Sequence, residues 1–256
     1  MARIAAQMYT LRDFLQTPEQ MPETFKKVKD MGYNAVQLSG LGPVDPKVLR
    51  DILVENELDV AATHNSMERF DSDIEGLIAD HKLWNCKYAG IGAMGPEYRE
   101  NVAAVKEFCR KINSYAKKLE QADMHFIYHN HWFEFARLPE TDDRIIDIML
   151  EECSDDVQFE VDTYWVQAGG ADPAQMIRKV AGRVDVMHFK DMRVSMDKPE
   201  AIMAEVGEGN LNWPEILKAC KEAGSKWYIV EQDTCQRHPM DSLAISLAHL
   251  KEWDLD

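Results

Sequence analysis

Residues 157–162 have the sequence VQFEVD, a short run of apolar and β-branched residues that ends in an aspartate. Such a run is typical of a strand that is buried in a parallel sheet. The carboxylate of Asp162 would then lie at the C-terminal end of the strand. In a barrel of parallel strands, this end forms the rim on which active sites are built.

The same pattern recurs along the chain. YHNHWFE (128–134), VMHFK (186–190) and IVEQD (229–233) each place acidic or imidazole side chains at the end of an apolar run. The eight predicted strands cover residues 3–8, 33–38, 58–63, 87–91, 124–129, 157–162, 184–190 and 226–231. Helical periodicity separates them, as in 20–31 and 97–121.

The alternation of strands and helices predicts an α/β fold, a (β/α)8 TIM barrel in a single domain over residues 1–256. An open doubly wound sheet stays as the alternative, because periodicity cannot show closure. Helix starts are expected at Thr17-Pro18, Asp45-Pro46 and Asp172-Pro173, where a capping residue precedes proline. The stretch 191–211 is irregular and long for a connection, so we expect it to cover the rim.

Composition narrows the class of protein. The net charge of −16 disfavours a nucleic-acid partner, because phosphate binding requires basic surface. The five cysteines have no close spacing, which indicates reduced thiols, and neither a secretory signal nor a membrane-spanning stretch is visible. We therefore expect a cytoplasmic protein that does not bind membranes.

Four side chains are candidate metal ligands. Glu134, Asp162, His188 and Glu231 follow four successive predicted strands, so they would converge at the rim of a barrel. Three carboxylates and an imidazole would suit a divalent cation. His129 is the alternative to Glu134 as the ligand from the fifth strand.

Other polar residues near the predicted strand ends are candidates for contact with a substrate. Lys190 could neutralise negative charge that develops during a reaction. The substrate-binding candidates are His64, Asn65, His131, Trp165 and Arg193. If the strand continues through both residues, we expect at most one of His129 and His131 to enter the barrel mouth.

Several segments together resemble the sugar phosphate isomerase/epimerase family, the xylose isomerase-like TIM barrels. They are AAQMYTLRD (5–13), YHNHWFEF (128–135), EVDTYW (160–165), HFKD (188–191), VGEGNLNW (206–213) and VEQD (230–233). The resemblance implies a divalent metal, often manganese, with Mg²⁺, Co²⁺ or Zn²⁺ as alternatives, held by Glu134, Asp162, His188 and Glu231. Several relatives carry their glutamate directly at the end of the fifth strand, where this chain has Tyr128-His129.

The resemblance also implies a reaction. The metal would stabilise the enediolate of a ketose-like sugar, keto-glycoside or cyclitol, with Lys190 and His64 around the substrate. Glu231 would transfer the proton, with Glu134 or His129 opposite. Isomerisation or epimerisation is the expected outcome, and dehydration or elimination, as in inosose dehydratase, is the alternative.

Two other classes of function fit the sequence less well. A DNA-repair endonuclease related to endonuclease IV would need more metal ligands and a basic groove, and a non-catalytic sugar-binding barrel would not need the metal set. Aromatic residues expected at the rim would suit a homo-oligomer. The sequence leaves open the oligomeric state, the sugar, and whether the sugar is phosphorylated.

Overall fold

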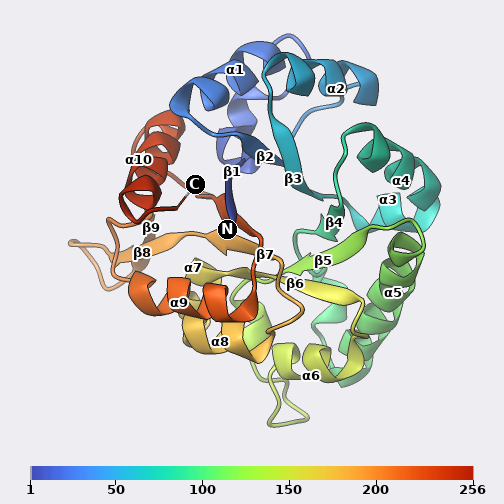
Figure 1. Ribbon diagram of the computed structural model, residues 1–256. Coiled ribbons are helices and arrows are strands. Elements are labelled where there is room, and N and C mark those ends of the chain that lie inside the picture. Colours follow the sequence, from blue (N-terminus) through green and yellow to red (C-terminus); the bar gives the residue numbers. More distant parts are fainter. Residues whose placement is uncertain (1, 256) are drawn as a thin grey trace.

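The computed structural model describes residues 2–255 as a closed barrel of eight parallel strands surrounded by helices (Figure 1). The order around the barrel is β1-β10-β7-β6-β5-β4-β3-β2, so the first and last barrel strands pair and close it. The barrel strands are β1 (Arg3–Gln7), β2 (Ala35–Leu38), β3 (Asp59–His64), β4 (Tyr88–Ile91), β5 (His125–His129), β6 (Val157–Asp162), β7 (Val186–Phe189) and β10 (Trp227–Val230).

Helices connect successive strands along the outside of the barrel. They are α1 (Met21–Met31), α2 (Pro46–Glu55), α3 (Met67–Ser72), α4 (Ile74–Leu83), α5 (Val102–Glu120), α6 (Ile145–Glu152), α7 (Thr163–Ala168), α8 (Pro173–Lys179), α9 (Trp213–Ala223) and α10 (Pro239–Glu252). Three 3₁₀ helices are η1 (Met8–Phe14), η2 (Pro96–Tyr98) and η3 (Phe133–Phe135).

The closed barrel confirms the predicted fold and removes the open sheet as an alternative. All eight predicted strands are present, with ends that differ by at most two residues. Asp45 and Asp172 cap α2 and α8 as expected. The helix start expected at Thr17-Pro18 is wrong, because Gln20 accepts hydrogen bonds from the backbone of Gln16 and Thr17 in a turn and α1 begins at Met21.

Two apolar layers hold the barrel together. Small and medium side chains, among them Ala5, Ala61 and Ile127, fill its interior, and a larger cluster lies between the strands and the helices. Gly90 is required by the packing, since a Cβ there would lie 2.3 Å from Ile127 Cγ1. On β5, Ile127 belongs to the interior layer, whereas Tyr128 packs outward against Phe108 of α5.

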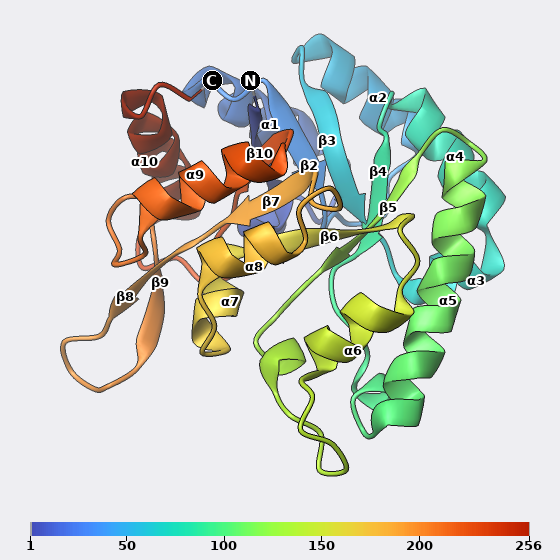
Figure 2. The ribbon, with the colours of Figure 1, turned by 60° about the horizontal axis from the view of Figure 1, so that its bottom comes forward.

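The stretch 191–211 has regular structure that was not predicted. It contains an antiparallel hairpin of β8 (Asp191–Val194) and β9 (Ala201–Ala204). Figure 2 shows this hairpin extending away from the barrel, and its tip residue Met196 is 99% exposed. The tip therefore does not cover the rim.

A single carboxylate organises the segment that follows the hairpin. Asp191 Oδ2 accepts hydrogen bonds from the backbone of Gly207 and Gly209 at 3.0 and 3.1 Å and from Trp213 Nε1 at 2.6 Å. Asp191 Oδ1 accepts from the backbone of Met192 and Leu211. The VGEGNLNW segment thus folds around Asp191.

The structure also describes the cysteines and the apolarity of the helices. All five cysteines are unpaired. Within residues 2–255, no helix combines the length and apolarity needed to span a bilayer.

Candidate metal centre and active site

Four buried side chains meet at the C-terminal ends of neighbouring strands. They are His129 from β5, Asp162 from β6, His188 from β7, and Glu231 directly after β10. Each offers one nitrogen or oxygen atom, and these atoms all lie within 4.8 Å of one another. The strand register explains the convergence, because Asp162 pairs with His188 and Ile229 pairs with His188 on the other side.

The burial and the chemistry of this group indicate that it could hold a metal ion. His188 Nδ1 lies 2.7 Å from Glu231 Oε2, and both side chains are buried. Buried charged groups are normally paired or coordinate a metal. Two imidazoles and two carboxylates are the donors that bind divalent transition metals.

Glu134, expected as a ligand, lies outside this group. After His129 the chain turns into η3, which carries Glu134 to the outer side of β5. There its carboxylate accepts hydrogen bonds from the Tyr128 hydroxyl and, at 2.8 Å, from the His131 backbone. The structure thus brings His129, the alternative from the same strand, to the place expected for Glu134. Burial raises the pKa of Glu134 to about 7.

Lys190 is fully buried beside the group. Its Nζ lies 3.0 Å from Asp162, 2.7 Å from Glu231 and 2.7 Å from Asp233. Burial acts to lower the pKa of Lys190, but these carboxylates raise it well above its usual value, so the ammonium is charged. Trp165 lies over it, with 5.7 Å between Nζ and the ring centre.

Below the four side chains, Glu160 forms a second layer that was missed in the sequence. Its carboxylate is fully buried and lies 3.0 Å from His188 Nε2, 2.5 Å from His64 Nε2 and 2.8 Å from Gln37 Nε2. Gln37 Oε1 also lies 2.6 Å from His188 Nε2. Carboxylates that orient a ligating histidine in this way fix its tautomer and ring position.

Glu160 and Glu231 also set the charge of His188. Burial acts to lower the pKa of His188, but the two carboxylates raise it to about 10. A metal ligand must be an unprotonated imidazole, so binding of a cation would require His188 to lose this proton.

His64 differs from His188 in its charge. Burial outweighs the attraction of Glu160 and lowers the pKa of His64, which makes the ring neutral. With Nε2–H donated to Glu160, Nδ1 is left as an acceptor, and it has no hydrogen-bond partner among the described residues. This is the arrangement of a histidine that is oriented by a carboxylate for proton transfer.

A cavity of about 250 Å³ opens above these groups at the barrel mouth. Its lining includes His64, His129, His131, Glu231 and Asp233. Both His129 and His131 line the mouth, where we expected at most one of them for a strand that continues through both; β5 ends at His129, so that condition is not met.

The other three substrate-binding candidates, Asn65, Trp165 and Arg193, do not line the mouth cavity. Asn65 lines a neighbouring groove instead. Arg193 is on β8, and it is not among the residues that line the mouth.

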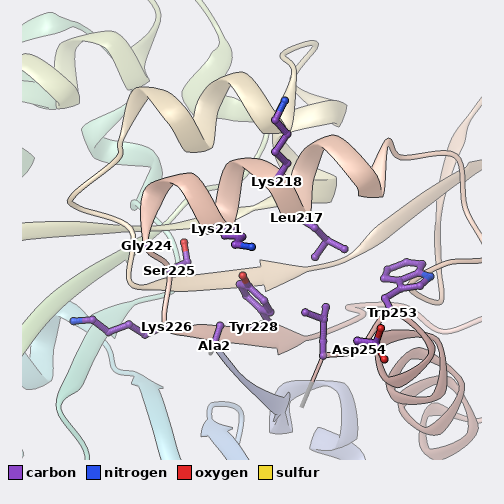
Figure 3. Close-up of a pocket in the computed structure, with 11 residues that line it drawn as sticks. Ala2, Leu217, Lys218, Lys221, Gly224, Ser225, Lys226, Tyr228, Trp253 and Asp254 are labelled. Atoms are coloured by element: carbon purple, nitrogen blue, oxygen red, sulfur yellow. The ribbon is translucent and has the colours of Figure 1, made fainter.

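Another cavity, of about 790 Å³, lies at the opposite end of the barrel, where β1 and β10 begin (Figure 3). Tyr228, Trp253 and Leu217 line it, with Lys221 at its edge, and none of its lining residues is a histidine. This cavity is therefore separate from the cluster of His129, Asp162, His188 and Glu231.

The fold and the site define a class: a (β/α)8 barrel with a buried cluster of two histidines and two carboxylates at its C-terminal rim. The family model for the xylose isomerase-like TIM barrel matches residues 25–253, and the chain belongs to this family.

Individual relatives are distant. An inosose dehydratase from Geobacillus kaustophilus is 23% identical, over 85% of this chain and 82% of that protein. A solved sugar phosphate isomerase/epimerase from Parabacteroides distasonis superposes with a TM-score of 0.80 at 21% identity, over 98% of this chain and 93% of that one. A solved L-ribulose 3-epimerase superposes with a TM-score of 0.70 at 15% identity, over 98% of this chain and 94% of that one. At these identities the structural matches show the fold alone.

Proposed function

We propose that the protein is a metal-dependent enzyme that removes a proton next to the carbonyl group of a keto sugar or cyclitol, and that it isomerises or epimerises this substrate. The observation that carries the proposal is the buried cluster of His129, Asp162, His188 and Glu231, whose donor atoms all lie within 4.8 Å of one another. It lies at the rim where barrel enzymes build their active sites.

These four residues would hold the metal. A bound divalent cation would polarise the carbonyl oxygen and stabilise the enediolate of the substrate. With two imidazoles among the donors, Mn²⁺, Co²⁺ or Zn²⁺ fits the site better than Mg²⁺, which prefers oxygen ligands. We favour Mn²⁺, because carboxylates supply the other two donors.

Residues of the chain would supply proton transfer and charge. Glu231 borders the cavity and would accept the proton from the substrate carbon. His64, neutral and held by Glu160, would deliver or remove a proton from a different direction. The Lys190 ammonium would attract negative charge that develops on the substrate oxygens.

Dehydration is the second candidate, and the similarity to an inosose dehydratase favours it. The same enediolate can expel a substituent from the neighbouring carbon instead of accepting a proton. His64 or Asp233 would then protonate the leaving oxygen. Burial raises the pKa of Asp233, which lets this carboxyl hold a proton more readily.

Elemental analysis of the purified protein, combined with deuterium exchange, tests the proposal. We expect one divalent ion per chain, weakened binding in Glu231→Gln, and metal-dependent exchange of a carbon-bound proton in ketoses or inososes. Absence of metal after incubation with manganese, or metal without any exchange across the panel, would contradict the enzyme and favour a binding protein.

A further inference from the structure

The strongest unassigned feature is a groove beside the mouth. We infer that the groove between α2 and α4 is a second subsite of the active site, which binds an uncharged ring attached to the reacting sugar. The substrate would then be a two-ring glycoside and not a free monosaccharide. The inference rests on the proposed function, because the groove matters only if a sugar reacts at the mouth.

The groove is continuous with the mouth. It has a volume of about 760 Å³, against about 250 Å³ for the mouth cavity, and Ser39 and His64 line both. Ligand sites typically enclose about 300–1,000 Å³, so the mouth alone is small and the two spaces together suit a larger molecule. A substituent on a sugar at the mouth would enter the groove beside His64.

An aromatic side chain borders the groove. Trp84, at the end of α4, is half-buried and fixed by a hydrogen bond of 2.9 Å from its Nε1 to the carbonyl oxygen of Pro46. Aromatic rings of this kind combine an apolar face with little freedom to lose on binding. Trp84 would therefore contact the face of a ring in the groove.

The charged residues in the groove indicate an uncharged ligand. Arg69 and Asp80 both line it and form an ion pair at 2.9 Å. No other lysine, arginine, aspartate or glutamate lines it within residues 2–255. The paired charges leave no excess positive charge for a phosphate, while their remaining donors and acceptors, and the amide of Asn65, would suit hydroxyl groups.

The wall formed by residues 39–44 is held in place by the residues that follow η1. The Gly42 backbone donates to the Leu15 carbonyl oxygen at 2.9 Å, and Gln16 Nε2 donates to the Gly40 carbonyl oxygen at 3.1 Å. A Cβ on Gly42 would lie 2.0 Å from Gln16 O, so this close approach requires glycine. The groove is thus formed before a ligand binds, which lowers the cost of binding.

The test compares ligands of one and two rings on the manganese-loaded protein. 3-Ketoglucose and the 3-keto derivatives of disaccharides would be titrated by calorimetry, and proton exchange with deuterated solvent would be followed for each. We expect at least one two-ring ketone to bind at least about tenfold more tightly than 3-ketoglucose. A phosphorylated ketose would serve as the charged comparison and should gain nothing from the groove.

Two variants test whether the tighter binding of two-ring ketones comes from the groove. Val44→Trp would fill the groove from its wall, and Val48→Trp, at an exposed position of α2 outside the groove, is the matched control. Val44→Trp should remove the tenfold preference and leave binding of 3-ketoglucose unchanged, while Val48→Trp should change neither. Trp84→Phe should retain part of the preference that Trp84→Ala loses, and thermal unfolding would verify that each variant is folded.

The outcomes separate the two proposals. If one-ring ketones exchange protons and two-ring ketones bind no better, or if a preference survives Val44→Trp, the subsite is wrong and the proposed function stands. Tighter binding of the phosphorylated ketose than of the two-ring ketones would also overturn the inference that the groove binds an uncharged ring. If no ketone exchanges, the proposed function fails and the subsite fails with it.

Discussion

His188 Nδ1 lies 2.7 Å from Glu231 Oε2 in a buried site, and Lys190 Nζ lies 2.7 Å from the same oxygen. On the other side of the ring, His188 Nε2 lies 3.0 Å from Glu160 and 2.6 Å from Gln37 Oε1. The imidazole is therefore held between two carboxylates. A divalent cation held by His188 and Glu231 would replace the proton of His188, because a ligating imidazole must be unprotonated.

The metal content of two variants should show whether His129 or Glu134 is a metal ligand. We expect His129→Ala to weaken binding of the metal roughly 100-fold, because it removes a donor. Glu134→Gln should retain the metal, since this carboxylate faces Tyr128 on the outer side of β5. Elemental analysis after dialysis against a weak chelator measures both, and loss of metal from Glu134→Gln alone would restore the original assignment.

Glu160→Gln should act through the two histidines that Glu160 contacts. The amide would keep the volume of the side chain but lose the charge and one acceptor. We expect metal affinity to fall about 10–100-fold, as for other residues that orient a ligand. Competition with a fluorescent chelator gives the affinity, and an unchanged value would show that Gln37 suffices to hold His188.

Lys190→Met should separate catalysis from metal binding. The variant leaves Asp162 and Glu231 without their ammonium partner, so a cation should be held at least as tightly. Turnover should fall about 10²–10³-fold if the ammonium stabilises developing charge. Metal content and proton exchange are measured on one preparation, and full turnover would make Lys190 structural.

His81 should make stability depend on pH. Burial lowers its pKa from 6.5 to about 4, and its ring nitrogens lie 2.7 Å from Thr63 Oγ1 and the Leu77 carbonyl oxygen. Between these values the unfolded chain binds the additional proton, so the free energy of unfolding falls as pH falls, by about 3 kcal/mol in total. Urea unfolding at pH 7.5 and pH 5 should show a smaller difference for His81→Gln than for the natural chain.

Asp191→Asn tests the segment after the hairpin. Asparagine has one accepting oxygen where aspartate has two, so its NH2 group would face either the donors of Gly207, Gly209 and Trp213 or those of Met192 and Leu211. Leaving buried donors unpaired should cost about 3 kcal/mol and lower the melting temperature roughly 6–12 °C. Calorimetry measures the shift, and Lys198→Ala, in the exposed hairpin tip, is a control that should change little.

The barrel was predictable because each buried strand produces a strong local signal. Apolar runs such as 157–162 and 226–231 are visible without knowledge of their partners. The hairpin β8–β9 was missed because β8 (DMRV) alternates polar and apolar residues instead of forming an apolar run, and because its antiparallel pairing with β9 lies outside the barrel.

The metal cluster was predictable in part. Asp162, His188 and Glu231 follow from where their strands end, but the choice between His129 and Glu134 depends on the turn after β5. That turn is stabilised by the contact of Glu134 with Tyr128, which no spacing reveals. Glu160 could have been found, because it lies two residues before Asp162 and so shares its face of β6.

The four residues of the cluster come from β5, β6, β7 and the end of β10, all in the second half of the chain. During synthesis from the N-terminus, His129, Asp162 and His188 emerge before Glu231. β10 also pairs with β1 to complete the barrel. Closure of the barrel and assembly of the complete donor set are therefore one event, and a nascent chain stalled before β10 would have neither.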